Sequence, residues 1–152
     1  MTISNASPLI SLSKLGRLDI LAMLFTSVHI PYEVYRETVE HERAPEDQSH
    51  AIKNAVSDGY LKIMYVKSRH SFTRTALKMG EQDVLSLALE QNPTRLILDD
   101  SAARNEAHDL GLSNILFFTS DILKLAAEKD WLDYHQALQE LKEKGEILPG
   151  SL

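Results

Sequence analysis

The sequence has no cysteine, which excludes both a disulfide framework and a zinc site built from thiolates. It also has no run of about 18 apolar residues that would cross a membrane, and no basic segment followed by a long apolar stretch that would mark a secretory signal. The six histidines show no metal-binding spacing, and neither of the glycine-rich patterns that cradle phosphates occurs. We therefore expect a cytoplasmic protein that does not associate with membranes and has no phosphate-binding loop of this kind.

What the chain does contain is an alternation of apolar and helical segments over 152 residues, a length typical of one domain. Strand composition marks residues 2–4, 27–30, 60–66, 95–100 and 114–118. Helical patterns cover residues 8–15, 17–25, 31–41, 49–59, 80–92 and 101–111, with two more helices after them. Strands separated by helices of about 10 residues predict βαβ units. We therefore predict a single α/β domain over residues 1–152, with a central, mostly parallel sheet flanked by helices.

Polar side chains follow three of the predicted strands, at the edge of a parallel sheet where ligands bind. They are Asn5 after the first strand, Asp99 and Asp100 after the fourth, and Thr119, Ser120 and Asp121 after the fifth. Further acids lie in the intervening helices: Glu37, Glu81 and Asp83. A hard divalent cation such as Mg²⁺ or Mn²⁺ is bound by carboxylates that converge from a few segments. Because such a cation generates hydroxide and holds a phosphodiester for attack, the pattern indicates a metal-dependent hydrolase.

Each acid also has a purely structural interpretation. Glu81 and Asp83 lie at the start of a helix, where a negative charge interacts favourably with the helix dipole. Asp83 precedes an apolar run and is the better candidate for the sheet edge. One of the two aspartates after the fourth strand is expected to cap the next helix; we assign the cap to Asp100 and the pocket to Asp99. Glu37 has the alternative of a solvated helix position.

The turn after the first strand poses a separate question, because it carries the neutral Asn5. Ser7 followed by Pro8 predicts the N-cap and the first residue of a helix. Asn5 is then not needed as the cap, and its place at a strand end predicts that its side chain faces the pocket.

Four motifs occur in one order along residues 2–130: NASPLISLSKLGRLDIL, IPYEVYRETV, GEQDVLSLALE and LILDDSAARNEAHDLGL. In this order and spacing the chain resembles PIN domains, specifically a group of small prokaryotic PIN-like proteins. The resemblance implies a sandwich around a central parallel sheet, with an acidic pocket that binds Mg²⁺ or Mn²⁺ and cleaves RNA. It also implies the toxin of a toxin/antitoxin pair, often a homodimer.

By position, the four acids of the family fall on Asn5, Glu37, Asp83, and Asp99 or Asp100. The resemblance thus implies catalytic roles for these five residues, with a metal ion held by Glu37, Asp83 and Asp99. Asn5 departs from the family pattern because a neutral amide stands in place of the first acid. We therefore expect a weaker metal site in an intact fold.

RNA binding by a chain with a net charge of −6 requires a local positive surface. Residues 66–80 supply four cations with no acid between them: Lys67, Arg69, Arg74 and Lys78. This segment is either an RNA-binding surface or a solvated loop and helix face. Arg104, one helical turn beyond Asp100, either contacts a phosphate or pairs with that acid.

Two other functions stay open beside a ribonuclease. The first is a non-catalytic PIN-like module that binds RNA or a protein, which the neutral Asn5 favours. The second is a receiver-like or phosphatase-like domain that uses Asp99 and Asp100, ranked lower because the segment after the fifth strand supplies no lysine. As partners we expect RNA, an antitoxin and a second copy of the chain, with the apolar segment 18–25 as exposed contact surface.

Overall fold

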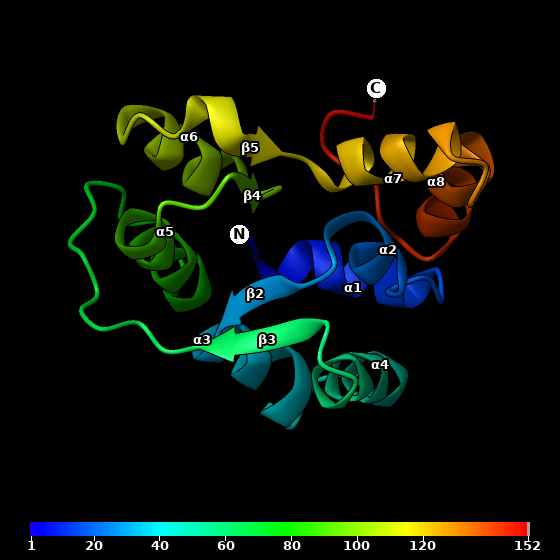
Figure 1. Ribbon diagram of the computed structural model, residues 1–152, viewed down its shortest axis with the longest axis horizontal. Helices are drawn as coiled ribbons and strands as arrows, with labels where there is room; N and C mark the ends of the chain where they lie inside the picture. Colours follow the sequence, from blue (N-terminus) through cyan, green and yellow to red (C-terminus); the bar gives the residue numbers. More distant parts are fainter. Residues whose placement is uncertain (152) are drawn as a thin grey trace.

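The computed structural model describes residues 1–151, which form an α/β fold around one five-stranded sheet (Figure 1). The strand order is β3-β2-β1-β4-β5, and every neighbouring pair is parallel. The strands are β1 (Thr2–Ser4), β2 (Val28–Pro31), β3 (Leu61–Met64), β4 (Arg95–Ile97) and β5 (Leu116–Phe117). The predicted fold class is confirmed.

Eight α-helices pack around this sheet within the described residues. They are α1 (Ala6–Lys14), α2 (Ile20–Phe25), α3 (Tyr32–Tyr35), α4 (Glu46–Ser57), α5 (Met79–Gln91), α6 (Ser101–Asp109), α7 (Thr119–Glu128) and α8 (Tyr134–Glu143). Figure 1 shows α5 on one side of the sheet and α1 and α2 on the other, with the α7–α8 pair far from α3. None of the helices in the described part of the chain has the length and apolar character needed to cross a membrane.

The centre of the sheet is β1, which lies between β2 and β4. Ile3 pairs with His29 on one side and Leu96 on the other, and Ile3 is fully buried. The apolar run 84–88 of α5 is buried and packs against this part of the sheet. Because all strands are parallel, their carboxyl ends meet at one edge. The residues that follow each strand are therefore brought to the same edge.

The first helix begins earlier than the sequence pattern predicted. α1 starts at Ala6, so Asn5 takes the N-cap position while Ser7 and Pro8 lie inside the first turn. Proline is tolerated there because the first N–H groups of a helix have no intrahelical partner. The prediction that Ser7 caps this helix was therefore wrong. Asn5 occupies the cap position, although its side chain makes no capping hydrogen bond.

Two other predictions also require correction. The helix predicted over residues 31–41 is divided into α3 and a π-helical turn, η1 (Arg36–Glu40), and the Thr38 hydroxyl of η1 donates to the Val34 carbonyl of α3. The apolar segment 18–25, expected as exposed contact surface, contributes instead to the core. Leu21 is fully buried in α2, and Met23 is the large apolar side chain of this segment that is exposed, at 46%.

Candidate functional site

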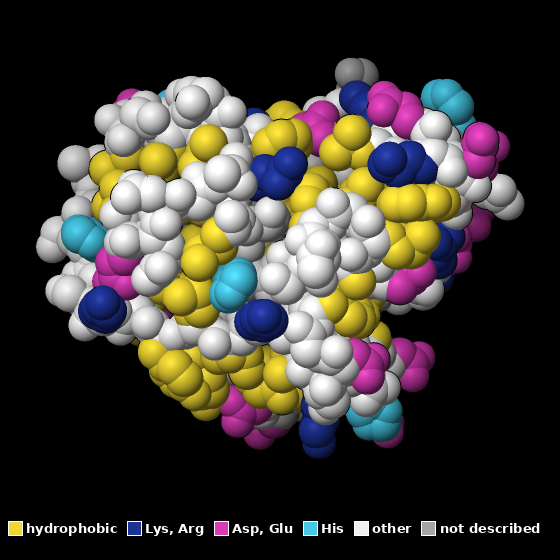
Figure 2. Space-filling model, viewed as in Figure 1, with side chains coloured by type: hydrophobic (Ala, Val, Ile, Leu, Met, Phe, Trp, Pro, Cys, Tyr) yellow, Lys and Arg dark blue, Asp and Glu magenta, His cyan; other side chains and the backbone are white. Residues whose placement is uncertain are grey.

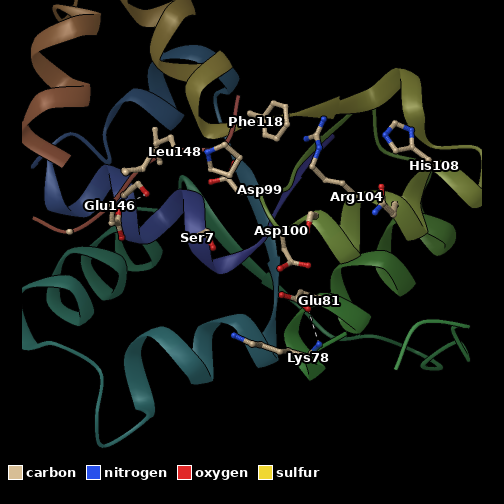
Figure 3. A pocket seen from close by; sticks show the side chains of 16 residues that line it. Ser7, Lys78, Glu81, Asp99, Asp100, Arg104, His108, Phe118, Glu146 and Leu148 are labelled. Carbon is tan, nitrogen blue, oxygen red and sulfur yellow. Dashed lines mark hydrogen bonds between the residues drawn. The ribbon is translucent and has the colours of Figure 1, made fainter. Parts of the chain in front are cut away.

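A cavity of about 680 Å³ lies at the carboxyl edge of the sheet, between the end of β4, helices α1, α5 and α6, and the segment 145–149 (Figure 3). Four carboxylates line it: Glu81, Asp99, Asp100 and Glu146. Lys78 and Arg104 also line it. The cavity therefore combines a set of oxygen ligands with two cations, although the chain as a whole is acidic.

Asp99 is held rigidly at the inner wall, two residues beyond β4. The backbone N–H of Thr119 donates to one carboxylate oxygen at 2.8 Å, and the Thr119 hydroxyl donates to the other at 2.7 Å. The residue is only 7% exposed, and burial raises the pKa of its carboxyl. Thr119 follows β5, the neighbour of β4, so the parallel pairing itself brings donor and acceptor together.

Asp100 has two roles at once. One carboxylate oxygen accepts a hydrogen bond from the Ala103 N–H at 2.9 Å and caps α6, as the sequence indicated. The same side chain lines the cavity. Both aspartates therefore line the cavity. From the sequence, only Asp99 was assigned to the pocket and Asp100 to the cap, but Asp100 does both.

Glu81 is the third acid of the cavity and lies in the first turn of α5. Its carboxylate accepts a hydrogen bond from the Lys78 N–H at 2.7 Å, which caps the helix. Burial and, less strongly, the negative charge of Asp100 raise the pKa of Glu81. Figure 3 shows the Glu81 and Asp100 carboxylates facing each other. The two acids therefore repel each other across a short gap.

Glu37 lies beside this group, in the π-helical turn η1. Its carboxylate lies against the Gly80 backbone, and a Cβ added at Gly80 would lie 2.7 Å from one of its oxygens. Burial and the nearby charges of Glu33 and Glu81 raise the pKa of Glu37. π-Helical turns are frequent at functional sites. Here the turn carries Glu37, whose carboxylate packs against the start of α5.

Asp83 lies elsewhere, although it is only two residues from Glu81. Residues two apart on a helix point in different directions, and Asp83 faces a shallow hollow beside β3. The guanidinium of Arg69 donates to both of its oxygens, at 2.5 and 3.1 Å. The structure thus does not bring Asp83 together with Asp99. Within residues 1–151, no three His, Asp or Glu side chains stand close enough to share one ion as a ready-made cluster.

Asn5 is 4% exposed and is not among the described residues that line the cavity. Its N–H donates to the Ile97 carbonyl at 3.1 Å, so its backbone lies directly beside the segment that leads into Asp99. Helix α1 presents Ser7 and Ser11 to the cavity instead. Asn5 is therefore adjacent to the site rather than in its wall.

The cations of the basic segment 66–80 are largely used within the fold. Arg69 is paired with Asp83, and Arg74 is paired with Glu106 at 2.5 Å and with Asp109 at 2.7 Å. Of the four predicted RNA-binding residues of this segment, Lys78 lies at the cavity. The side chain of Lys67 is exposed, and its backbone N–H donates a hydrogen bond to the Glu90 carboxylate.

Arg104 lies in the cavity wall and, in the described chain, forms no ion pair with Asp100. It donates to the Leu98 carbonyl at 2.8 Å, and its guanidinium carbon lies 3.5 Å from the centre of the Phe118 ring. Burial lowers its pKa, although an arginine keeps its charge in proteins. Figure 3 shows Arg104 and Phe118 side by side at the rim. The guanidinium is thus fixed in place without being neutralised by a direct carboxylate partner.

Sequence reasoning underestimated Glu81 and missed Glu146. Helical periodicity contained the signal for Glu81, because Asp83 and Glu81 cannot both face the sheet edge. Glu146 had no such signal. Its carboxylate accepts hydrogen bonds from Ser11 at 2.8 Å and Lys14 at 2.9 Å, contacts that depend on how the segment 145–149 returns to α1.

The parallel sheet and the buried acids at its carboxyl edge define an α/β protein whose site is built from strand ends and helix starts. The family model described as "DUF3368: PIN domain" matches residues 1–150, so the chain belongs to the PIN-domain family. No curated protein and no solved structure matches the chain. PIN domains are typically nucleases, commonly with divalent metals.

Proposed function

We propose that this PIN domain is a ribonuclease that depends on Mg²⁺ or Mn²⁺. The observation that carries the proposal is the gathering of buried and half-buried carboxylates from separate elements: Glu37, Glu81, Asp99 and Asp100. Burial raises the pKa of three of these acids, and their charges repel. A divalent cation relieves both effects, because it supplies the opposite charge that the group lacks.

The donor set fits Mg²⁺ by its chemistry, since it offers only oxygen ligands. This ion keeps several waters and is often bound through one or two carboxylates together with substrate phosphates, so a tight cluster of three side chains is not required. We assign the direct contacts to Glu81 and Asp100, whose carboxylates face each other, with Asp99 and Glu37 acting beside them. Glu81 thus replaces Asp83 in the set of ligands. When bound, the ion supplies a water of lowered pKa and holds the phosphodiester.

The chain's own residues supply the remaining functions. Thr119 fixes the orientation of Asp99 through two hydrogen bonds. Arg104, held by the Leu98 carbonyl and the Phe118 ring, binds a phosphate oxygen of the substrate backbone. Lys78 adds a second positive charge. An RNA backbone therefore meets cations at the entrance and carboxylates inside.

The decisive experiment compares Glu81→Gln with Asp83→Asn, two charge-neutralising changes in the same helix turn. Purified protein is assayed for cleavage of a panel of small RNAs with and without Mn²⁺. We expect Glu81→Gln to lose at least 100-fold in rate, roughly the effect of removing a group that stabilises the transition state. Asp83→Asn is the matched control and retains most activity. Equal losses in both variants, or no metal-dependent cleavage by the unaltered protein, would refute the proposal.

A second function is supported by a specific observation. The neutral Asn5 stands where the family pattern has its first acid, and this favours a non-catalytic PIN-like module that binds RNA or a protein. An antitoxin partner and a homodimer remain proposals that follow from the toxin hypothesis. Growth arrest on expression, dependent on Asp99, would support a toxin. RNA binding without metal-dependent cleavage would support the binding module.

A further inference from the structure

Two tyrosines form a stacked pair at one end of the sheet. The ring centres of Tyr32 and Tyr65 are 5.5 Å apart, and the ring planes differ by 20°. The Glu40 carboxylate lies near the phenol of Tyr32 and raises its pKa. Tyr65 is 72% exposed, the highest value among the large apolar side chains of the described residues. The pair is therefore a prebuilt stack with accessible ring surface.

The position of this pair relates it to the cavity. Tyr32 follows β2 and Tyr65 follows β3, so both lie at the carboxyl edge that also carries Asp99 after β4. Three strand spacings separate β3 from β4, which corresponds to about 14 Å. Figure 2 shows hydrophobic side chains gathered at the lower edge of the molecule, over α3 and the end of β3. A flexible strand that enters the cavity can reach this surface along the same edge.

The surroundings of the tyrosines suit a flat ligand of low charge. A hollow of about 230 Å³ adjoins them, lined also by Glu33, Val66, Arg69 and Asp83. Its two carboxylates are each neutralised, Glu33 by Arg36 and Asp83 by Arg69. Arg69 keeps 41% of its side chain exposed, so a planar guanidinium is available beside the rings. Aromatic rings and arginine planes are the groups on which unpaired nucleobases stack.

We propose that the Tyr32–Tyr65 pair is a stacking site for an unpaired base of the RNA substrate, a few nucleotides from the bond that is cut. The inference rests on the proposed ribonuclease function and adds to it a binding subsite outside the cavity. Stacking has little dependence on base identity, because every base presents a flat face. The site therefore selects for unpaired rather than paired RNA, without reading a particular sequence.

The test uses Tyr65→Ala, with Tyr65→Phe as the conservative variant and Met23→Ala, an exposed apolar side chain of α2, as the matched control. Binding of labelled single-stranded RNAs of increasing length is measured by anisotropy with Mg²⁺, in an Asp99→Asn background that keeps the RNA intact. We expect Tyr65→Ala to weaken binding by about fivefold to 100-fold, the usual range for one stacked base. Tyr65→Phe and Met23→Ala bind as the parent does. The loss appears only with RNAs long enough to span the distance.

Kinetics and spectroscopy test the stacking site separately from the proposed ribonuclease activity. In the otherwise unaltered enzyme, Tyr65→Ala raises KM for long RNAs and leaves kcat unchanged, and a fluorescent adenine analogue is quenched at one position in a Tyr65-dependent manner. Cleavage by the unaltered enzyme with no effect of Tyr65→Ala overturns the stacking site alone. Absence of both RNA binding and cleavage overturns the ribonuclease and the stacking site together. A change in oligomeric mass caused by Tyr65→Ala identifies a protein interface and also overturns the inference.

Discussion

Replacing Gly80 by alanine is expected to weaken metal binding without weakening the fold. A Cβ at this position would lie 2.7 Å from one Glu37 carboxylate oxygen, whereas ordinary contact begins at 3.4 Å. The carboxylate must therefore move by about 0.7 Å. Metal–oxygen distances tolerate only about 0.2 Å, so a displacement of this size disturbs any role of Glu37 beside the ion. We expect Mn²⁺ binding to weaken about 10-fold to 100-fold, the usual effect of disturbing groups around a metal's ligands.

The same substitution favours the fold itself. Alanine in place of glycine in a helix stabilises it by roughly 0.5–1 kcal/mol, and Gly80 does not have a positive φ that would oppose the change. Thermal unfolding without metal should therefore show an unchanged or slightly higher Tm, while calorimetric titration with Mn²⁺ shows the loss.

Glu37→Gln provides the control for this experiment. If Gly80→Ala acts by displacing the Glu37 carboxylate, adding it to Glu37→Gln causes little further loss of affinity, which a double-mutant cycle measures directly. Wild-type Mn²⁺ affinity in Gly80→Ala would refute the assignment of Glu37 to the site. A fully additive second loss would show that Gly80 acts by another route.

Three further predictions concern the neighbourhood of the site and its supports. Asn5→Asp adds a negative charge beside the segment leading into Asp99. We therefore expect the Mn²⁺ affinity measured by calorimetry to rise about 10-fold and the Tm without metal to fall. Equal affinity would show that residue 5 is too far from the ion to interact with it. Arg104→Lys keeps the charge but loses the planar group over Phe118, so KM for RNA should rise at least fivefold; an unchanged KM would contradict phosphate binding. The ion pair with Arg74 lowers the pKa of Glu106, so its stabilisation is present above the unfolded-state pKa of about 4.3 and is lost as pH falls through the lower folded-state pKa. Urea unfolding should show a shallower acid dependence in Glu106→Gln than in the unaltered protein, and parallel curves would contradict this.

The fold was predictable because its elements have strong local signals. A short apolar run such as 96–98 leaves no polar face, which indicates a buried parallel strand in a sheet covered by helices. The acids after β4 follow directly from this order, because a strand end in a parallel sheet fixes the edge at which Asp99 lies. Asp100 was likewise identified as a cap from its place before a helical pattern.

The rest depended on geometry that a linear pattern does not contain. The direction of Glu37 is set by a π-helical turn and by the missing side chain of Gly80, 43 residues further along the chain. The choice of Glu81 over Asp83 depends on the exact rotation of α5 against the sheet. Arg69 and Arg74 look like free cations in sequence, and they are neutralised by acids on α5 and α6 that come later in the chain.

The contact of Glu146 with Ser11 joins residues 135 positions apart. The Pro149 carbonyl likewise accepts a hydrogen bond from Ser120, so the segment 145–149 is hydrogen-bonded to both α1 and α7. During synthesis, the sheet and its acids emerge from the ribosome before this segment does. The cavity wall is therefore completed only once residues 145–149 have been made, well after the strands and the acids that it encloses.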